Sequence, residues 1–150
     1  MHLLAEQRVV IARPVPAVFE YATDLERFGE WFPEVLGVES ADALAPAAVG
    51  KQYLERVNVP LRGERKVMIT VREAQPATRF VTEGRLTPLL PRMELGFAAH
   101  GDQACEFTFR MFSRSGSPAV RWLLLPLARR VLRRRAAAGV AALKRRLEGR

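Results

Sequence analysis

Residues 11–35 decide the fold, and they read IARPVPAVFEYATDLERFGEWFPEV. This stretch holds three phenylalanines, a tyrosine and a tryptophan, although aromatic residues make up only 8% of the chain. Pro16 suits the first turn of a helix because its missing N–H has no intrahelical partner there, which predicts a short helix over Pro16 to Ala22. Thr23-Asp24 can cap a second short helix, which Pro33 closes. We therefore expect two short helices whose aromatic side chains gather around an apolar space.

Strands flank these two helices. Leu3 to Ala12 carries apolar side chains at Val9 and Ile11 directly after Arg8, which predicts a first strand. Six further segments have period-two alternation or β-branched residues: Val35 to Ser40, Lys51 to Val59, Glu64 to Glu73, Arg79 to Leu86, Arg92 to Ala99 and Ala104 to Phe112. The gaps between most of them are short and rich in turn residues, so neighbouring strands must be antiparallel. Ala41 to Gly50 is expected to be a loop.

The C-terminal third changes to a helical period. Apolar residues recur at steps of three or four: Val120, Leu124, Leu127, Val131, Leu132, Ala136, Val140, Leu143 and Leu147. The remaining positions are mostly arginine, so one apolar stripe faces a partner. Pro126 either kinks this helix or starts it afresh after a short turn over Val120 to Leu125.

The order of elements predicts an α+β fold in one domain, residues 1–150. A curved antiparallel sheet of about seven strands wraps around the long C-terminal helix, and the two short helices follow the first strand. Such a sheet leaves a hollow wherever helix and strands do not meet. This hollow is the expected place for a ligand.

Composition narrows the function classes. The formal charge of +8 comes mainly from arginine, which a GC-rich genome also raises, so basicity is weak evidence for nucleic acid and no specific nucleic-acid partner is expected. Cys105 is the only cysteine, which excludes an internal disulfide and a thiolate metal cluster. No apolar run is long enough to span a membrane and no secretory signal is seen, so the cytoplasm is the expected location.

Few groups can do chemistry. His2 and His100 stand far apart at a chain end and in a turn, and the sequence contains neither a glycine-rich phosphate loop nor a GxSxG motif. We therefore expect no metal and no cofactor. The remaining candidates for moving a proton or stabilising charge are Tyr53, Glu55, Arg72, Glu94, Glu106 and Arg110.

The quoted stretch also resembles a known family. The pattern I-x-x-P, then V-F, an Asp, an aromatic-rich turn and a Pro, together with an amphipathic C-terminal helix ending in LKRRLE, is similar to the START-like and plant-allergen-like helix-grip (SRPBCC) superfamily. Within it the chain looks most like the bacterial polyketide cyclase/dehydrase group. The resemblance implies binding of lipids, sterols, polyketides or quinone-like molecules between sheet and helix, and only some members are enzymes.

Site residues follow from this resemblance. Phe28 and Phe32 match the pocket aromatics of aromatase/cyclases, and Arg72 lies near the position of an arginine thought to polarise the substrate. Met68, Thr70 and Val35 depart from the tryptophan, serine and tyrosine usual in cyclases. The implied catalytic residues are Arg72, Glu106 and Tyr53. The implied ligand-binding residues are Phe28, Trp31, Phe32, Tyr53, Met68, Thr70, Arg72, Arg85, Leu95, Phe97, Thr108, Arg110, Trp122, Leu127 and Val131.

Two strand registers remain open. The family register turns Lys66, Met68, Thr70 and Arg72 inward, whereas apolar alternation buries Val67, Ile69 and Val71 instead. The last strand offers the same choice. Apolar alternation turns Cys105, Phe107, Phe109 and Met111 inward, whereas the family register turns Glu106, Thr108 and Arg110 inward. The family register gives a polar pocket and an apolar outer face that suggests a homodimer or a surface for another partner. Alternation gives an apolar pocket and solvated arginines.

Three functions follow, in order of preference. The first is binding of a hydrophobic or aromatic small molecule, lipid or polyketide-like, in the cavity. The second is a polyketide cyclase or dehydratase using Arg72 with Glu106 or Tyr53. The third is an interaction module that docks through the arginine-rich helix, for which Arg129, Arg130, Arg133 and Arg134 could meet an anionic membrane surface.

Overall fold

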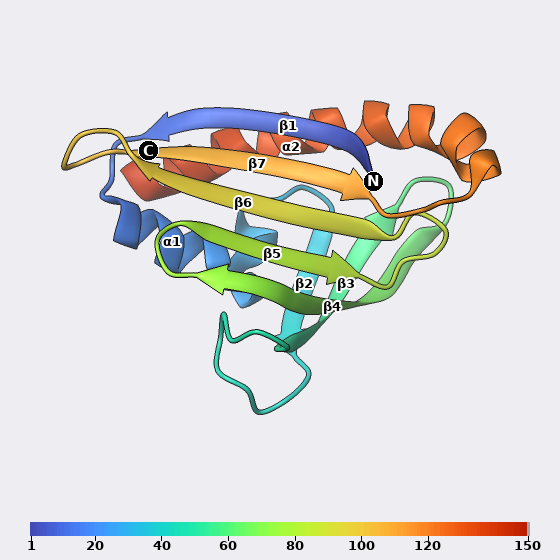
Figure 1. Cartoon of the computed structure of the whole chain (residues 1–150), viewed down its shortest axis with the longest axis horizontal. Coiled ribbons are helices and arrows are strands. Elements are labelled where there is room, and N and C mark those ends of the chain that lie inside the picture. Colours follow the sequence, from blue (N-terminus) through green and yellow to red (C-terminus); the bar gives the residue numbers. More distant parts are fainter. Residues whose placement is uncertain (150) are drawn as a thin grey trace.

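A computed structural model describes residues 1–149 of the chain. A single sheet of seven antiparallel strands, in the order β1-β7-β6-β5-β4-β3-β2, curves beside one long helix (Figure 1). The elements in chain order are β1 (His2–Ile11), α1 (Val15–Thr23), η1 (Leu25–Glu30), β2 (Val35–Ser40), β3 (Gln52–Val59), β4 (Gly63–Gln75), β5 (Arg79–Gly84), β6 (Pro91–Ala99), β7 (Cys105–Ser113), η2 (Val120–Leu124) and α2 (Leu125–Glu148). The predicted helix-grip architecture is confirmed, including two short helices after the first strand.

The second short helix differs in kind from the prediction. η1 is a 3₁₀-helix, and the Asp24 side chain makes no capping hydrogen bond to it. The Asp24 carboxylate lies 3.4 Å from the Arg27 guanidinium instead. A 3₁₀-helix suits so short an element, because its tighter hydrogen bonds close within a few residues.

A short turn over Val120–Leu124 precedes α2, as in one of the two alternatives for Pro126, but this turn is π-helical and runs into α2 without a break. Pro126 therefore lies inside a continuous stretch of helical backbone, and a π-helical turn is one of the irregularities that interrupt an α-helix. Leu125 is fully buried at this junction. The junction therefore anchors the start of α2 while the side chains of η2 stay outside the core.

The strands follow apolar alternation. We call the sheet face toward η1 and α2 the inner face and the opposite one the outer face. Val67 and Val71 are buried on the inner face, as are Cys105, Phe107 and Phe109. The outer positions are Lys66, Met68, Thr70, Arg72, Glu106, Thr108 and Arg110. This corrects the inward orientation that the resemblance implied for these residues, because burying β-branched side chains is favourable whereas burying unpaired lysine or arginine is costly.

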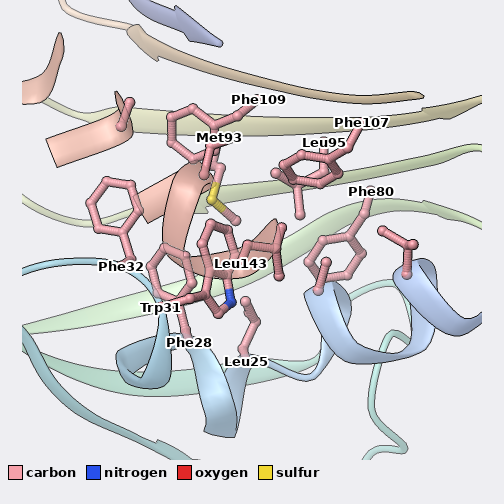
Figure 2. Packing of buried hydrophobic residues seen from close by; sticks show 14 of the residues in the cluster. Leu25, Phe28, Trp31, Phe32, Phe80, Met93, Leu95, Phe107, Phe109 and Leu143 are labelled. Carbon is pink, nitrogen blue, oxygen red and sulfur yellow. The ribbon is translucent and has the colours of Figure 1, made fainter. Parts of the chain in front are cut away.

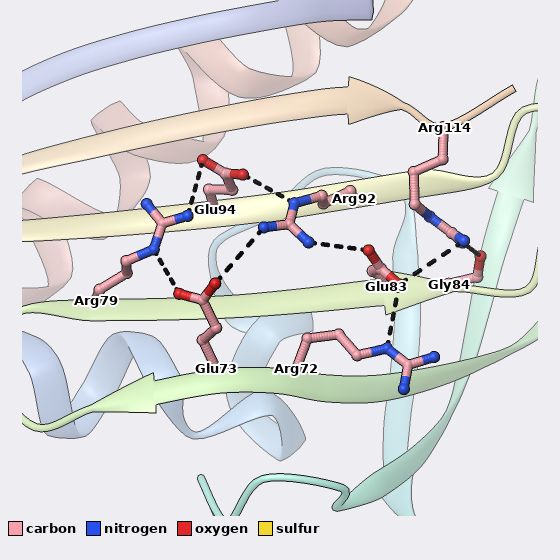
Figure 3. Close-up of polar contacts among 8 residues, drawn as sticks. All are labelled: Arg72, Glu73, Arg79, Glu83, Gly84, Arg92, Glu94 and Arg114. Carbon is pink, nitrogen blue, oxygen red and sulfur yellow. Dashed lines mark hydrogen bonds and ion pairs between the residues drawn. The ribbon is translucent and has the colours of Figure 1, made fainter. Parts of the chain in front are cut away.

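The outer face is charged. Side chains of β4, β5 and β6 form a chain of ion pairs across it, extended by an arginine that follows β7 (Figure 3). Its shortest links join Arg79 to Glu73 at 2.7 Å and Arg92 to Glu94 and Glu83 at 2.8 and 2.9 Å. The apolar outer surface from which a homodimer was expected is therefore not present on these strands.

The inner face carries an aromatic cluster contributed by η1 and two strands (Figure 2). Phe32 stacks on Phe28 and on Phe109, with ring centroids 5.0 and 5.5 Å apart. The Trp31 ring meets the edge of Phe107 at 6.3 Å. These contacts explain why aromatic residues are concentrated in this segment: they tie η1 and the residues directly after it to β7.

Gly139 lets α2 approach this cluster closely. A Cβ atom at this position would lie 3.1 Å from Phe32 Cδ2 and 3.3 Å from both Pro33 Cδ and the Trp31 carbonyl oxygen. The neighbouring residues Ala136, Val140 and Leu143 are buried as well. The C-terminal half of α2 is therefore packed tightly against η1 and the sheet.

We expect Gly139→Leu to lower the free energy of unfolding by about 1–3 kcal/mol, because the larger side chain must displace Phe32 or the backbone at Trp31. Ala137→Leu is the matched control, since Ala137 is exposed on the same helix, and it should change stability by less than about 0.5 kcal/mol. Urea unfolding followed by circular dichroism measures both. Equal stability of the two variants would contradict the close approach.

Candidate functional site

A cavity of ≈ 200 Å³ lies between the inner face of the sheet, η1 and the N-terminal half of α2. Its wall is almost entirely apolar. The residues that line it include Leu25, Phe28, Phe32, Val35, Val38, Val57, Val59, Ile69, Thr82, Gly84, Leu86, Met93, Met111, Leu124, Ala128, Val131 and Leu132. The charged residues in the wall are Glu55, Arg62 and Arg135.

The cavity exists because the two halves of α2 meet different neighbours. Ala136, Gly139 and Leu143 in the C-terminal half are buried. Val131 and Leu132 in the N-terminal half are only partly buried, and both line the hollow. On the sheet side of the cavity, Gly84 has no side chain to occupy the space. A Cβ atom there would lie 3.1 Å from Ile69 Cδ1. The helix thus acts as a roof over this part of the sheet.

Exposed lining residues mark the mouth of the cavity. Pro60 and Arg62 in the β3–β4 turn, Thr87 and Pro88 after β5, and Leu127 on α2 are solvent-exposed and also line the cavity. The cavity therefore opens where these three segments meet, at the N-terminal end of α2. A molecule can enter there without displacing a strand.

Glu55 places a carboxyl group on this apolar wall. It lies on β3 between Tyr53 and Val57 on the inner face, and its partners on the adjacent strands are Val38 and Val67. Within residues 1–149 it forms no hydrogen bond and no ion pair. Burial among apolar groups disfavours the charged form and raises the pKa of Glu55 from an ordinary value of 4.5 to about 7.

Arg135, on α2, lines the same cavity as Glu55. It is half-buried, and burial lowers the pKa of its guanidinium while the charge of Glu34 opposes that shift. Leu127, Val131 and Arg135 also line a shallow groove with Arg130 and Arg134. The cavity mouth therefore continues into a basic surface.

The structure places the predicted ligand-binding residues in four groups. The first lines the cavity: Phe28, Phe32, Leu127 and Val131. The second is buried in the core behind its wall: Trp31, Tyr53, Leu95 and Phe97. The third lies on the outer face: Met68, Thr70, Arg72, Thr108 and Arg110. The fourth, Arg85 and Trp122, lies exposed outside the sheet.

The three predicted catalytic residues are not brought together. The Arg72 guanidinium pairs with Glu83 on the outer face at 3.1 Å, and Glu106 occupies the outer face of β7. Tyr53 is on the inner face, 1% exposed, and burial raises the pKa of its phenol. The sheet itself separates the tyrosine from the other two, so one molecule in the cavity cannot meet all three.

Sequence reasoning named Glu55 among the titratable candidates but assigned it no place in the site. The signal was present in the alternation of β3. Tyr53 and Val57 are expected to face inward, and a residue two positions from each must share their face. A glutamate in that position is an exception to the apolar pattern, and such exceptions are functional-site candidates.

The chain belongs to the family described as polyketide cyclase/dehydrase and lipid transport, which matches residues 2–148. No curated protein sequence matches it significantly.

Solved structures resemble the chain over nearly its whole length. A START superfamily protein from Mycobacterium smegmatis is 15% identical with a TM-score of 0.74, covering 98% of both chains. The Zhui aromatase/cyclase from Streptomyces sp. R1128 is 19% identical with a TM-score of 0.67, covering 96% of this chain and 92% of that one. The di-domain aromatase/cyclase StfQ of the steffimycin biosynthetic pathway is 14% identical with a TM-score of 0.70, covering 99% of this chain and 50% of that one. These likenesses establish the START-like fold.

Among the described residues, no helix has both the length and the apolar character needed to cross a membrane.

We expect Glu55→Gln to stabilise the protein increasingly as pH rises from about 4.5 to 7. Below this window the carboxyl is protonated in both the folded and the unfolded state, whereas within it only the unfolded state releases the proton. Relative to wild type, the gain should approach about 1–3 kcal/mol above pH 7. Urea unfolding at several pH values measures it. Glu39→Gln, at an exposed position of β2, is the control and should show no such trend. A gain independent of pH would contradict the raised pKa.

Proposed function

We propose that the protein binds a hydrophobic or aromatic small molecule in the cavity between the sheet and α2. The observation that carries this proposal is the cavity itself: an apolar wall, an open mouth and the carboxyl group of Glu55, which has no partner within residues 1–149. A few polar groups in a largely apolar hollow are typical of small-molecule sites. The family, whose description includes both polyketide cyclases and lipid transport, supports the same class of ligand.

The cavity volume limits the size of this ligand. At ≈ 200 Å³ it is smaller than the ~300–1,000 Å³ usual for drug-sized ligands. A compact aromatic molecule or a single short acyl chain fits this space, whereas a complete two-chain lipid would have to leave much of its surface outside.

Cyclase or dehydratase activity is the alternative. The mechanism that relied on Arg72 and Glu106 receives no support from their positions on the outer face. The cavity offers Glu55 for proton transfer and Arg135 for stabilising negative charge on an oxygen. The enzyme alternative therefore now depends on these two residues.

A second feature favours delivery of the ligand from a membrane. Trp122 and Leu123 of η2 are 72% and 81% exposed, and Leu61, between the mouth residues Pro60 and Arg62, is 96% exposed. Exposed Arg130 and Arg134 adjoin the same mouth. Apolar side chains beside arginines match the interface of an anionic bilayer, where each basic residue contributes about 1 kcal/mol. We propose that this end of the molecule docks on anionic lipid headgroups.

Cavity filling tests the first proposal. Ala128→Phe places an aromatic ring in the hollow and should weaken binding of 2-methylnaphthalene at least about tenfold, a loss of about 1.4 kcal/mol. Equilibrium dialysis measures the affinity. Ala141→Phe, on an exposed position of the same helix, should leave it unchanged. If the wild-type protein does not bind the probe, or both variants bind like wild type, the cavity is not the binding site.

Vesicle sedimentation tests the membrane proposal. Wild-type protein should sediment with vesicles of phosphatidylglycerol and phosphatidylcholine, less so as salt is added, and not with phosphatidylcholine alone. Replacing Trp122 and Leu123 by alanine should weaken binding about tenfold or more, because their apolar surface no longer enters the interface. Replacing Leu44 and Val49, which are also exposed but lie in the loop before β3, should have little effect. Similar losses in both double variants would refute docking through η2.

A further inference from the structure

Glu55 is the one carboxyl group in the cavity wall formed by residues 1–149, and nothing in that part of the chain uses it structurally. We propose that it anchors a neutral ligand through a hydroxyl group, an alcohol or phenol carried on an apolar body. This deepens the proposed function by naming the ligand class, and it rests on that function. Glu55 is then a specificity-determining residue.

The surroundings of Glu55 leave its hydrogen-bonding capacity to a ligand. The neighbouring inner-face residues Tyr53 and Val57 and the cross-strand partners Val38 and Val67 present mainly apolar surface to it. On the outer face, by contrast, glutamates of β4, β5 and β6 pair with arginines, as Glu94 does with Arg92 at 2.8 Å. A carboxyl without such a partner in an apolar cavity is costly unless something else bonds to it.

The charged groups around the cavity favour a ligand whose hydrogen-bond donor is uncharged. Arg62 in the β3–β4 turn and Arg135 on α2 are the other charged groups of the wall, and the lining residues of η1 and β2 are apolar. A ligand ammonium would be attracted by ionised Glu55 but repelled by both guanidinium groups. A ligand carboxylate could approach these arginines but would be repelled by Glu55. A hydroxyl donates a hydrogen bond to Glu55 without adding a charge to the cavity.

Ionisation of Glu55 gives this anchor a pH dependence. The ionised carboxyl accepts a stronger, charge-assisted hydrogen bond from a hydroxyl than the protonated group does. An apolar ligand of the same shape offers no such bond and removes water from the charge. Preference for the hydroxyl ligand should therefore rise as pH increases through about 7, where Glu55 titrates.

The test compares 2-naphthol with 2-methylnaphthalene, which has nearly the same shape but no donor. Both affinities are measured by equilibrium dialysis at pH 5.5 and 8.5, where a phenol with a pKa of about 10 stays largely neutral. For wild type, the ratio of the 2-naphthol affinity to the 2-methylnaphthalene affinity should favour 2-naphthol and should increase about tenfold between the two pH values.

Three variants locate the effect. Glu55→Gln keeps an acceptor but cannot ionise, so the ratio should not change with pH. Glu55→Leu removes the acceptor. It should abolish the preference for 2-naphthol while the variant still binds 2-methylnaphthalene. Glu39→Gln should behave like wild type, because Glu39 is exposed on β2.

Each outcome has one meaning. Equal affinities for the two probes in wild type, or the same pH dependence in Glu55→Gln, would overturn the anchor while leaving the apolar site intact. Binding of neither probe would overturn the proposed function and the anchor with it.

Discussion

The close contact of Gly139 with Phe32 and Pro33 determines how α2 lies on the sheet. It holds the C-terminal half of the helix against the residues that follow η1, where Phe32 is itself stacked on Phe109 of β7. Leu125, fully buried where η2 meets α2, holds the other end of the helix, so the stretch between these two anchors spans the sheet. The N-terminal half therefore becomes a roof, and the space below it is the cavity.

The two faces of the sheet differ in how their charged side chains are paired. On the outer face, arginines and glutamates of neighbouring strands neutralise each other in a continuous network (Figure 3). On the inner face, Glu55 has no such partner within residues 1–149. An isolated carboxyl in an apolar hollow weakens the fold as pH rises from about 4.5 to 7, so its presence is more easily explained by a bound molecule than by stability.

Much of the fold could be predicted from the sequence because alternation and helical period are local. Val67 and Val71, and likewise Phe107 and Phe109, read as inward-facing from the pattern alone, and the structure confirms it. The resemblance pointed to the right family but to the wrong face for Arg72, because sequence likeness does not fix a strand register to one residue.

The site was harder to predict because it depends on distances between elements. No local pattern reveals that α2 packs closely at Gly139 and stands away from the sheet at Val131. Phe28 and Phe32, which the resemblance implied as ligand-binding residues, lie in the cavity wall. Glu55 could have been found by applying alternation to β3, where it falls between Tyr53 and Val57.

The most direct test of the account uses the four methionines of the chain. Met93 and Met111 line the cavity, whereas Met1 is exposed and Met68 lies on the outer face. Titrating protein carrying ¹³C-labelled methionine methyl groups with 2-methylnaphthalene should shift the Met93 and Met111 methyl signals, saturating with one ligand per chain, and leave Met1 and Met68 unmoved. Unchanged Met93 and Met111 signals, or equal shifts at all four methionines, would contradict a ligand-binding cavity between the sheet and α2.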